Sequence, residues 1–223
     1  MSDPMKLVQH YAAAAEASTE LDHELLQHLV AAGTARGWFP TISALRTRFA
    51  EHESEEAVDA SLERLHAHQL LTSSNGRVRI VVGGITHQKG PIRAQTEADN
   101  QTFYLSSALD VLTIAPTLQK AVVVTSECPV TQTMLELQLD AQGQVTSATP
   151  GPVAAFVPDW PGGSIYEALG QQGRLLANDE ALATWTAQHG DPDGLSLTTD
   201  TVASLGSELA HLLSALYVRV SVR

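Results

Sequence analysis

The sequence is poor in cysteine and in basic residues. Cys128 is the one cysteine among 223 residues, so no internal disulfide can form. Lys and Arg number 13 against 25 Asp and Glu, which gives a net charge of −12. Nonspecific binding to nucleic acid relies on Lys and Arg to neutralise phosphates, so this balance argues against it. We therefore expect no nucleic-acid partner.

Long apolar runs are also absent, since no stretch approaches the roughly 18 residues that a membrane span requires. The N-terminus does not pair a basic segment with an apolar one, as a secretory signal would. These features predict a cytoplasmic protein that does not contact a membrane. Hydrophobic residues make up 43% of the chain and charged residues 17%, which is typical of a folded globular protein.

The usual signatures of metal, phosphate and dinucleotide sites are missing as well. Among the nine histidines, His66 and His68 lie two residues apart and so on different faces of a helix, which is not a zinc-ligand spacing. Gly83-Gly84 and Gly162-Gly163 lack the lysine, strand and helix of a phosphate-binding loop, so we interpret them as turns. The sequence predicts neither a metal site nor a cofactor.

What the first part of the chain does contain is a helical pattern that ends in a hairpin. Three segments have apolar residues at helical spacing: 5–36, 42–50 and 55–69. Asn75-Gly76 then favours a two-residue turn, and residues 77–81 alternate like a strand. Three helices and a hairpin follow the order of a winged helix, so residues 1–82 are expected to form a winged-helix-like domain.

A winged helix suggests DNA binding, but the charge of the relevant helix opposes it. The segment Ser54–Arg64 carries four acids and one arginine, and phosphates in the major groove would repel it. Arg77 and Arg79 on the predicted wing are too few to offset this charge. We interpret the domain as a structural or dimerising lid on the second domain, which would allow a homodimer.

The second part of the chain has the mixed pattern of an α+β protein. Residues 83–100 are predicted to be an irregular linker because of their glycines and Pro91, and residues 101–223 to form the second domain. Helices are predicted over 103–112, 164–170, 179–189 and 202–216, and strands over 121–126, 133–139 and 153–157. The expected architecture is α+β, with a small mixed or antiparallel sheet flanked by helices.

Residues 103–112 read Phe-Tyr-Leu-Ser-Ser-Ala-Leu-Asp-Val-Leu and resemble the signature helix of the organomercurial (alkylmercury) lyase family. There an aromatic residue precedes a cysteine, Ala-Leu-Asp and a hydrophobic pair. Further matches follow in the family's order, and they extend the resemblance over roughly residues 20–216: Pro116, Cys128, Leu175-Leu176-Ala177, Trp185 and Gly194-Leu195. The resemblance implies an alkylmercury-lyase-like α+β domain and also fits the helical N-terminal region.

The resemblance implies a site that has lost its thiols. Members of the family cleave carbon–mercury bonds with two cysteine thiolates, which are soft ligands for a soft metal, and an aspartate that transfers a proton. Asp110 matches the aspartate, whereas Ser107 stands where the first catalytic cysteine would be. No cysteine lies in residues 165–176, where the second would align near Gly170-Gln171. Cys128 matches a third cysteine, which is structural in the family.

Ser107 and Asp110 are the candidate catalytic residues. They lie three residues apart on the predicted helix and so share one face. We expect Asp110 to act as a general acid/base with a pKa raised by burial, and Ser107 to form a hydrogen bond with the substrate. Phe103, Tyr104 and Cys128 are the candidate substrate-binding residues. In the structural alternative, Ser107 packs, Asp110 caps or bridges a neighbouring element, and Cys128 is buried and inert.

Three functions follow from these residues. The first is an enzyme that acts on a small, largely apolar organic substrate by acid/base chemistry of lyase or rearrangement type through Asp110. The second is a noncatalytic small-molecule or metal-binding sensor on the same scaffold. The third is a genuine alkylmercury lyase that uses Cys128 and external thiols. Asp110→Asn separates the first two, since it abolishes turnover by an enzyme yet leaves the affinity of a binding protein within a few-fold.

Overall fold

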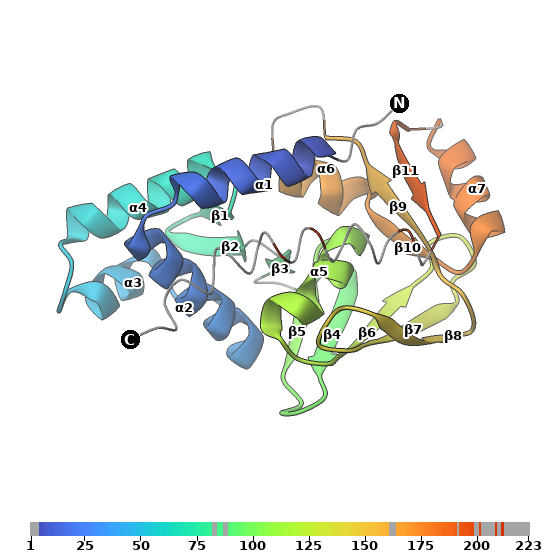
Figure 1. Cartoon of the computed structure of the whole chain (residues 1–223), viewed down its shortest axis with the longest axis horizontal. Helices are drawn as coiled ribbons and strands as arrows, with labels where there is room; N and C mark the ends of the chain where they lie inside the picture. The colour runs from blue at the N-terminus through green and yellow to red at the C-terminus, as the bar shows by residue number, and fades with distance from the viewer. Residues whose placement is uncertain are drawn as a thin grey trace.

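A computed structural model describes residues 5–81, 84–86, 89–160, 164–190 and 192–198, together with residues 201, 208 and 211. Its first part is helical, but residues 5–36 form two helices where one was expected (Figure 1). The four helices are α1 (Met5–Ala17), α2 (Glu20–Arg36), α3 (Ile42–Phe49) and α4 (Glu55–Ala67). The break falls at Thr19, where the Thr19 side chain accepts from the Asp22 amide and the Asp22 carboxylate accepts from the Thr19 amide. This reciprocal capping box begins a new helix.

The predicted hairpin at Asn75-Gly76 is confirmed. It joins β1 (Leu71–Ser74) to β2 (Arg77–Val81), which pair antiparallel. Asn75 has a φ of 52° and Gly76 a φ of 69°, the left-handed pair that a type I′ turn needs to match the twist of its strands. The hairpin is also the start of a much larger sheet, because β2 pairs on its other side with β3 (Ile85–Thr86).

That sheet has eight antiparallel strands in the order β1-β2-β3-β5-β4-β6-β7-β8, so it is not the small sheet that was expected. The remaining strands are β4 (Ile92–Thr96), β5 (Thr102–Leu105), β6 (Val122–Glu127), β7 (Met134–Leu139) and β8 (Val145–Thr149). The irregular linker predicted over residues 83–100 is wrong, since β4 lies between β5 and β6. In β4, Ile92, Ala94 and Thr96 are buried and Arg93 between them is exposed, which is the alternation of a strand.

The helix predicted over residues 103–112 is half wrong. Phe103 and Leu105 belong to β5 and are fully buried, whereas the helix α5 spans Ala108–Leu118. All residues from Ala108 to Ala115 are buried, because α5 packs against both β6 and β9 (Ala154–Pro158). Because α5 is buried on all sides from Ala108 to Ala115, no boundary between a buried and an exposed face marks its start in the sequence.

The alternation in the next hairpin is confirmed. Leu135, Leu137 and Leu139 of β7 are buried, while Met134 and Glu136 are exposed. β7 pairs with β6 over its whole length, from Glu127 opposite Met134 to Val122 opposite Leu139. One face of this part of the sheet therefore packs on the core and the other faces solvent.

A second, three-stranded sheet in the order β10-β9-β11 packs beside α5 (Figure 1). Its other elements are α6 (Ile165–Gln172), β10 (Arg174–Leu176), α7 (Asp179–Gln188) and β11 (Gly194–Leu197). The strand predicted over 153–157 and the helices over 164–170 and 179–189 are confirmed as β9, α6 and α7. The helix predicted over 202–216 lies almost wholly outside the described residues, as do the turns at Gly83 and Gly162-Gly163.

Several contacts join the helical part to the rest of the molecule. His10 of α1 lies 2.9 Å from the His68 carbonyl through Nε2, and its ring lies 4.7 Å from the ring of Trp160, just after β9. The Gln69 side chain accepts a hydrogen bond of 2.5 Å from the Ile165 amide at the start of α6. α1 therefore bridges the first helices and the second sheet. In the described part of the chain, no helix combines the length and apolarity needed to cross a bilayer.

An ion pair between the buried carboxylate of Asp22 and the partly exposed Arg64 joins α2 to α4, and its loss is expected to destabilise the fold. Asp22 is 1% exposed and accepts hydrogen bonds from Ser61 and from Arg64 Nη2 at 3.0 Å. Burial raises the pKa of Asp22, but the bonds from Arg64, Ser61 and Thr19 outweigh it and hold this pKa below its ordinary value. Asp22→Ala should lower the free energy of unfolding by about 3 kcal/mol.

Urea unfolding followed by circular dichroism measures this loss. The matched control is Asp59→Ala, because the Asp59–Arg46 pair has side chains 39% and 37% exposed. Exposed pairs contribute less than about 1 kcal/mol, so the control should barely move the midpoint. Equal losses in the two variants would contradict the importance assigned to the buried Asp22 carboxylate.

Candidate functional site

The candidate site lies where β5 passes into α5. The hydroxyls of Ser106 and Ser107 lie 2.6 Å and 2.7 Å from Asp110 Oδ2. Ser107 is also the N-cap of α5, since its Oγ accepts from the Asp110 amide at 3.4 Å. The structure thus brings Ser107 and Asp110 together, as their spacing suggested, but through a helix start and not through one helix face. Ser106 is a second hydroxyl that the sequence analysis did not single out.

Asp110 is a buried carboxyl group with a raised pKa. Its side chain is 7% exposed, and burial raises its pKa even though hydrogen bonds from Ser106 and Ser107 act in the opposite direction. Desolvation dominates because an ionised carboxylate loses far more hydration energy than a neutral one. A protonated carboxylic acid can donate a proton, which is what a general acid requires.

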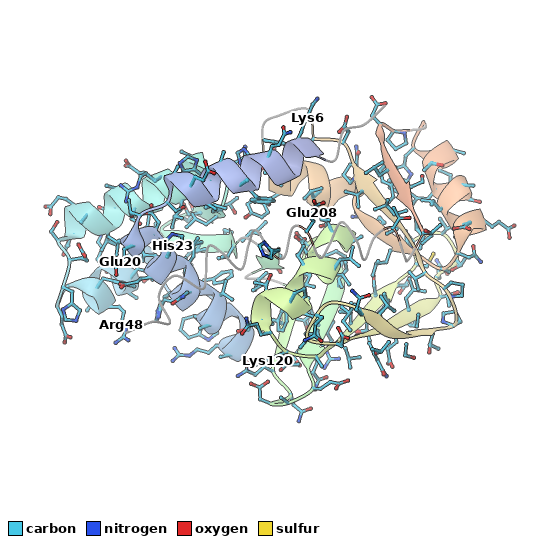
Figure 2. All side chains as sticks on the ribbon, viewed as in Figure 1. Lys6, Glu20, His23, Arg48, Lys120 and Glu208 are labelled. Carbon is cyan, nitrogen blue, oxygen red and sulfur yellow. The ribbon has the colours of Figure 1, made fainter. Side chains whose placement is uncertain are left out.

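A tyrosine of α1 lies near this carboxyl group. Tyr11 of α1 is 5% exposed, and its pKa is raised by burial and by the negative charge of Asp110. Tyr11 therefore lies within electrostatic reach of Asp110 from the buried side of the helix. Figure 2 shows Lys6 on the outer side of the same helix, where it is exposed. Both groups are buried, and nothing in the sequence pattern of α1 indicated that Tyr11 would lie near Asp110.

Gly84 forms another wall of the site. A Cβ atom on this residue would lie 1.8 Å from Asp110 Cγ, and its φ of +68° favours glycine. Its carbonyl accepts a hydrogen bond of 3.1 Å from the Ser106 amide. The turn predicted at Gly84 is confirmed, but the reason for its glycine is the close approach of the backbone to a carboxyl group 26 residues later in the chain.

α6 faces the two serines with glycines. A Cβ on Gly170 would lie 3.8 Å from the Cβ of Ser106, and one on Gly173 would lie 3.0 Å from the Cβ of Ser107. The resemblance places the family's second cysteine near Gly170-Gln171. The structure thus sets this position beside Ser106, in ordinary van der Waals contact.

A cleft of about 570 Å³ opens next to the site. Ser106 and Gly170 line it, so Asp110 is one hydrogen bond away from the cleft through Ser106. The other polar side chains of its lining come from the first hairpin, from the β3–β4 region and from α6: Ser74, Arg79, Thr86, Lys89 and Tyr166. A small ligand in this cleft could contact the Ser106 hydroxyl while the carboxyl group behind it stays dry.

The three predicted substrate-binding residues lie elsewhere. Phe103 is fully buried in the core, and Tyr104, next to it on β5, is half-buried opposite Thr86 and Arg93. Cys128 is fully buried in the turn after β6, where its amide donates to the Thr133 carbonyl. The described lining of the cleft includes none of Phe103, Tyr104 and Cys128.

Cys128 is expected to resist alkylation in the folded protein. Burial raises the pKa of its thiol, but hydrogen bonds from Thr131 and from nearby backbone amides outweigh it and lower this pKa overall. Access still decides reactivity, because the thiol is 0% exposed. Excess iodoacetamide should label almost no protein under native conditions and one thiol per chain in urea, as mass spectrometry would show. Fast labelling of the native protein would reveal an accessible, reactive thiol.

Because the pKa of Asp110 is raised, we expect this group to make the stability of the fold depend on pH. An acid whose pKa is higher in the folded state favours folding when protonated, so its contribution to stability falls as pH rises from its unfolded value toward its folded value. Asp110→Asn removes this dependence and keeps an oxygen that can accept from the serines. Relative to the natural chain, the variant should gain stability between pH 4 and pH 7 in urea titrations. A constant difference across this range would contradict the raised pKa.

In the described residues, no group of three or more His, Cys, Asp and Glu side chains is placed to hold a metal ion. The site instead combines three features: an α+β fold, a strand-to-helix turn that presents an aspartate, and glycines opposite that turn. They define the class that the comparisons with known proteins then specify. The sequence model of the alkylmercury lyase family matches residues 85–211, more than half of the chain, so this protein belongs to that family.

Individual relatives agree with this assignment. An alkylmercury lyase of Streptomyces lividans is 32% identical over 144 residues, which cover 64% of this chain and 64% of that protein. The chain thus matches a little under two thirds of this relative's length. The crystal structure of the mercury-bound form of MerB2 superposes with a TM-score of 0.75 at 16% identity, over 94% of this chain and 99% of that one. At this identity the structure supports the fold, and the resemblance read from residues 103–112 is confirmed.

Proposed function

We propose that this protein is an enzyme that uses the alkylmercury-lyase scaffold for proton transfer to a small, largely apolar organic substrate, and does not cleave carbon–mercury bonds. The observation that carries the proposal is the buried Asp110 carboxyl group, one hydrogen bond behind a cleft. We further propose that it works in the cytoplasm by lyase or rearrangement chemistry, and that the winged-helix-like helical part serves as a lid.

The proton path runs through Ser106. A hydroxyl group both donates and accepts, so Ser106 can pass its proton to a substrate atom in the cleft while it takes one from Asp110. The Ser107 hydroxyl, on the same carboxyl oxygen at 2.7 Å, stabilises the carboxylate that remains. Once a product has left, water in the cleft returns a proton through Ser106, and the raised pKa of Asp110 favours this reprotonation.

The absence of thiols at the site supports a substrate other than an organomercurial. Ser106 and Ser107 occupy the turn, Gly170 stands opposite, and Cys128 is fully buried away from the cleft lining. Serine hydroxyls are hard, neutral ligands at neutral pH, whereas mercury prefers thiolates. The lyase chemistry that the relatives' names imply would need two thiolates beside Asp110.

Two measurements test the proposal. Gas chromatography of phenylmercuric acetate incubated with the protein and excess thiol should show no benzene above the thiol-only control. NMR of protein labelled at the aspartate carboxyl carbons should show one group, lost in Asp110→Asn, that titrates above its ordinary pKa. Benzene release that depends on Asp110 would restore mercury chemistry, and a normal titration of Asp110 would remove the general acid. Once a turned-over compound is found, full turnover by Asp110→Asn would show that Asp110 is not the general acid.

A further inference from the structure

The cleft beside Ser106 has a charge opposite to that of the whole protein. The chain carries a net charge of −12, yet Arg79 and Lys89 line this cleft, and its described lining contains no Asp or Glu. The ion pairs formed among the described residues join other partners: Arg46–Asp59, Arg64–Asp22 and Lys120–Asp99. Two cations in a concave surface focus a positive potential there and attract anions.

Arg79 is held by a hydrogen bond within the first hairpin. It lies on β2, is half-buried, and donates from Nε to Ser74 Oγ across the first hairpin at 2.8 Å. This bond fixes the plane of the guanidinium group, and no described residue accepts from its two terminal nitrogens. A fixed guanidinium fork matches the paired oxygens of a carboxylate or phosphate. Lys89 is exposed and adds a second, more adjustable charge.

We infer that the cleft binds a small organic anion, whose carboxylate or phosphate oxygens contact Arg79 and Lys89 while its apolar body lies against Ile80 and Pro91. Its far end would then reach the Ser106 hydroxyl. The orientation toward Ser106 rests on the proposed function, whereas the binding of the anion does not. The inference narrows the substrate to molecules that carry an apolar body and one anionic group.

The protonation state of Asp110 is compatible with such a ligand. An ionised carboxylate one residue behind the cleft wall would repel an anion across a poorly hydrated region. Burial raises the pKa of Asp110, which favours the neutral form and so weakens this repulsion. The same group can therefore store a proton and tolerate a negatively charged substrate.

Isothermal titration calorimetry with benzoate, phenyl phosphate and benzamide tests the inference. Benzamide has the shape of benzoate without its charge, and comparison of the two anions distinguishes a carboxylate site from a phosphate site. At least one anion should bind saturably and at least tenfold more tightly than benzamide, and its affinity should fall as salt rises. Equal binding of benzoate, phenyl phosphate and benzamide, or no saturable binding of either anion, would overturn the inference.

Variants assign the charge to its residues. Arg79→Gln should weaken the binding of the anion roughly tenfold or more. Lys89→Gln should weaken it by a smaller factor, because the exposed charge of Lys89 is screened by salt. The matched control is Arg93→Gln, since exposed Arg93 on β4 bonds to Gln95 and Thr102 and does not line the cleft. Unchanged affinity in Arg79→Gln, with the circular dichroism spectrum retained, would overturn the assignment.

The test separates this inference from the proposed function. Asp110→Asn should bind the anion within a few-fold of the natural chain, because the amide keeps the site neutral. A high pKa for Asp110 without anion binding would remove the inference and leave the general acid in place. Tight anion binding with a normally titrating Asp110 would remove the general acid and leave the anion-binding cleft in place.

Discussion

The double variant Ser107→Cys/Gly170→Cys is expected to release benzene from phenylmercuric acetate, which the natural chain and both single variants should not do. A Cβ at Gly170 would lie 3.8 Å from that of Ser106, so a cysteine fits there without displacing backbone. Ser107 bonds to Asp110, and Gly170 lies beside Ser106, which bonds to the same carboxyl oxygen, so both new thiols are expected near Asp110. Two thiolates supply the soft ligands that the serines lack, and Asp110 supplies the proton.

The measurement is benzene by gas chromatography with excess thiol, beside a thiol-only control. Adding Asp110→Ala to the double variant should return the signal to background. Gly173→Cys in place of Gly170→Cys is the matched control, because a Cβ there would meet the Leu169 carbonyl at 2.6 Å. If the folded double variant binds no mercury and releases no benzene, the loss of cysteines does not explain the loss of the family's chemistry.

The parts of the fold that could be predicted are those with a local physical cause. The alternation of Leu135, Leu137 and Leu139 follows from one buried sheet face, and Asn75-Gly76 follows from the backbone angles of its turn. The break at Thr19 has a local cause too, since Asp22 three residues later completes a capping box. It was missed because the apolar spacing on both sides looked continuous.

The parts that could not be predicted depend on distant neighbours. The sequence predicts a linker where β4 lies because Gly90 and Pro91 precede the strand and Arg93 and Gln95 interrupt its apolar residues. Its place between β5 and β6 arises from pairing across the whole domain. A strand's position in a sheet is set by such nonlocal contacts, on which short-range propensity has little influence.

The residues of the candidate site also fall into those with a local signal in the sequence and those placed by distant contacts. Ser107 and Asp110 could be found because a short motif holds both, and the resemblance drew attention to it. Tyr11 and Gly84 could not be found, since nothing in the sequence around either residue indicates a carboxyl group as its neighbour. The cations of the cleft, Arg79 and Lys89, come from a hairpin and a loop that only the folded sheet brings beside Ser106.

Gly84→Ala is expected to destabilise the fold by about 3 kcal/mol or more and to abolish any activity that depends on Asp110. An alanine at a φ of +68° costs about 1 kcal/mol in backbone strain. The larger cost comes from its Cβ, which would lie 1.8 Å from Asp110 Cγ and must push the carboxyl group away from Ser106 and Ser107. Overpacking of this kind typically costs a further 1–3 kcal/mol, so about 3 kcal/mol is a central value.

Two further variants separate the collision from the strain. Gly76→Ala has the same left-handed geometry, with a φ of +69°, but its Cβ would have no neighbour within 4 Å, so it should lose only about 1 kcal/mol. Gly84→Ala combined with Asp110→Ala removes the carboxyl group that the new Cβ would strike. The combined loss in urea unfolding should therefore be smaller than the sum of the two single losses. If the two losses in unfolding free energy simply add, the new Cβ at position 84 does not collide with the Asp110 carboxyl group.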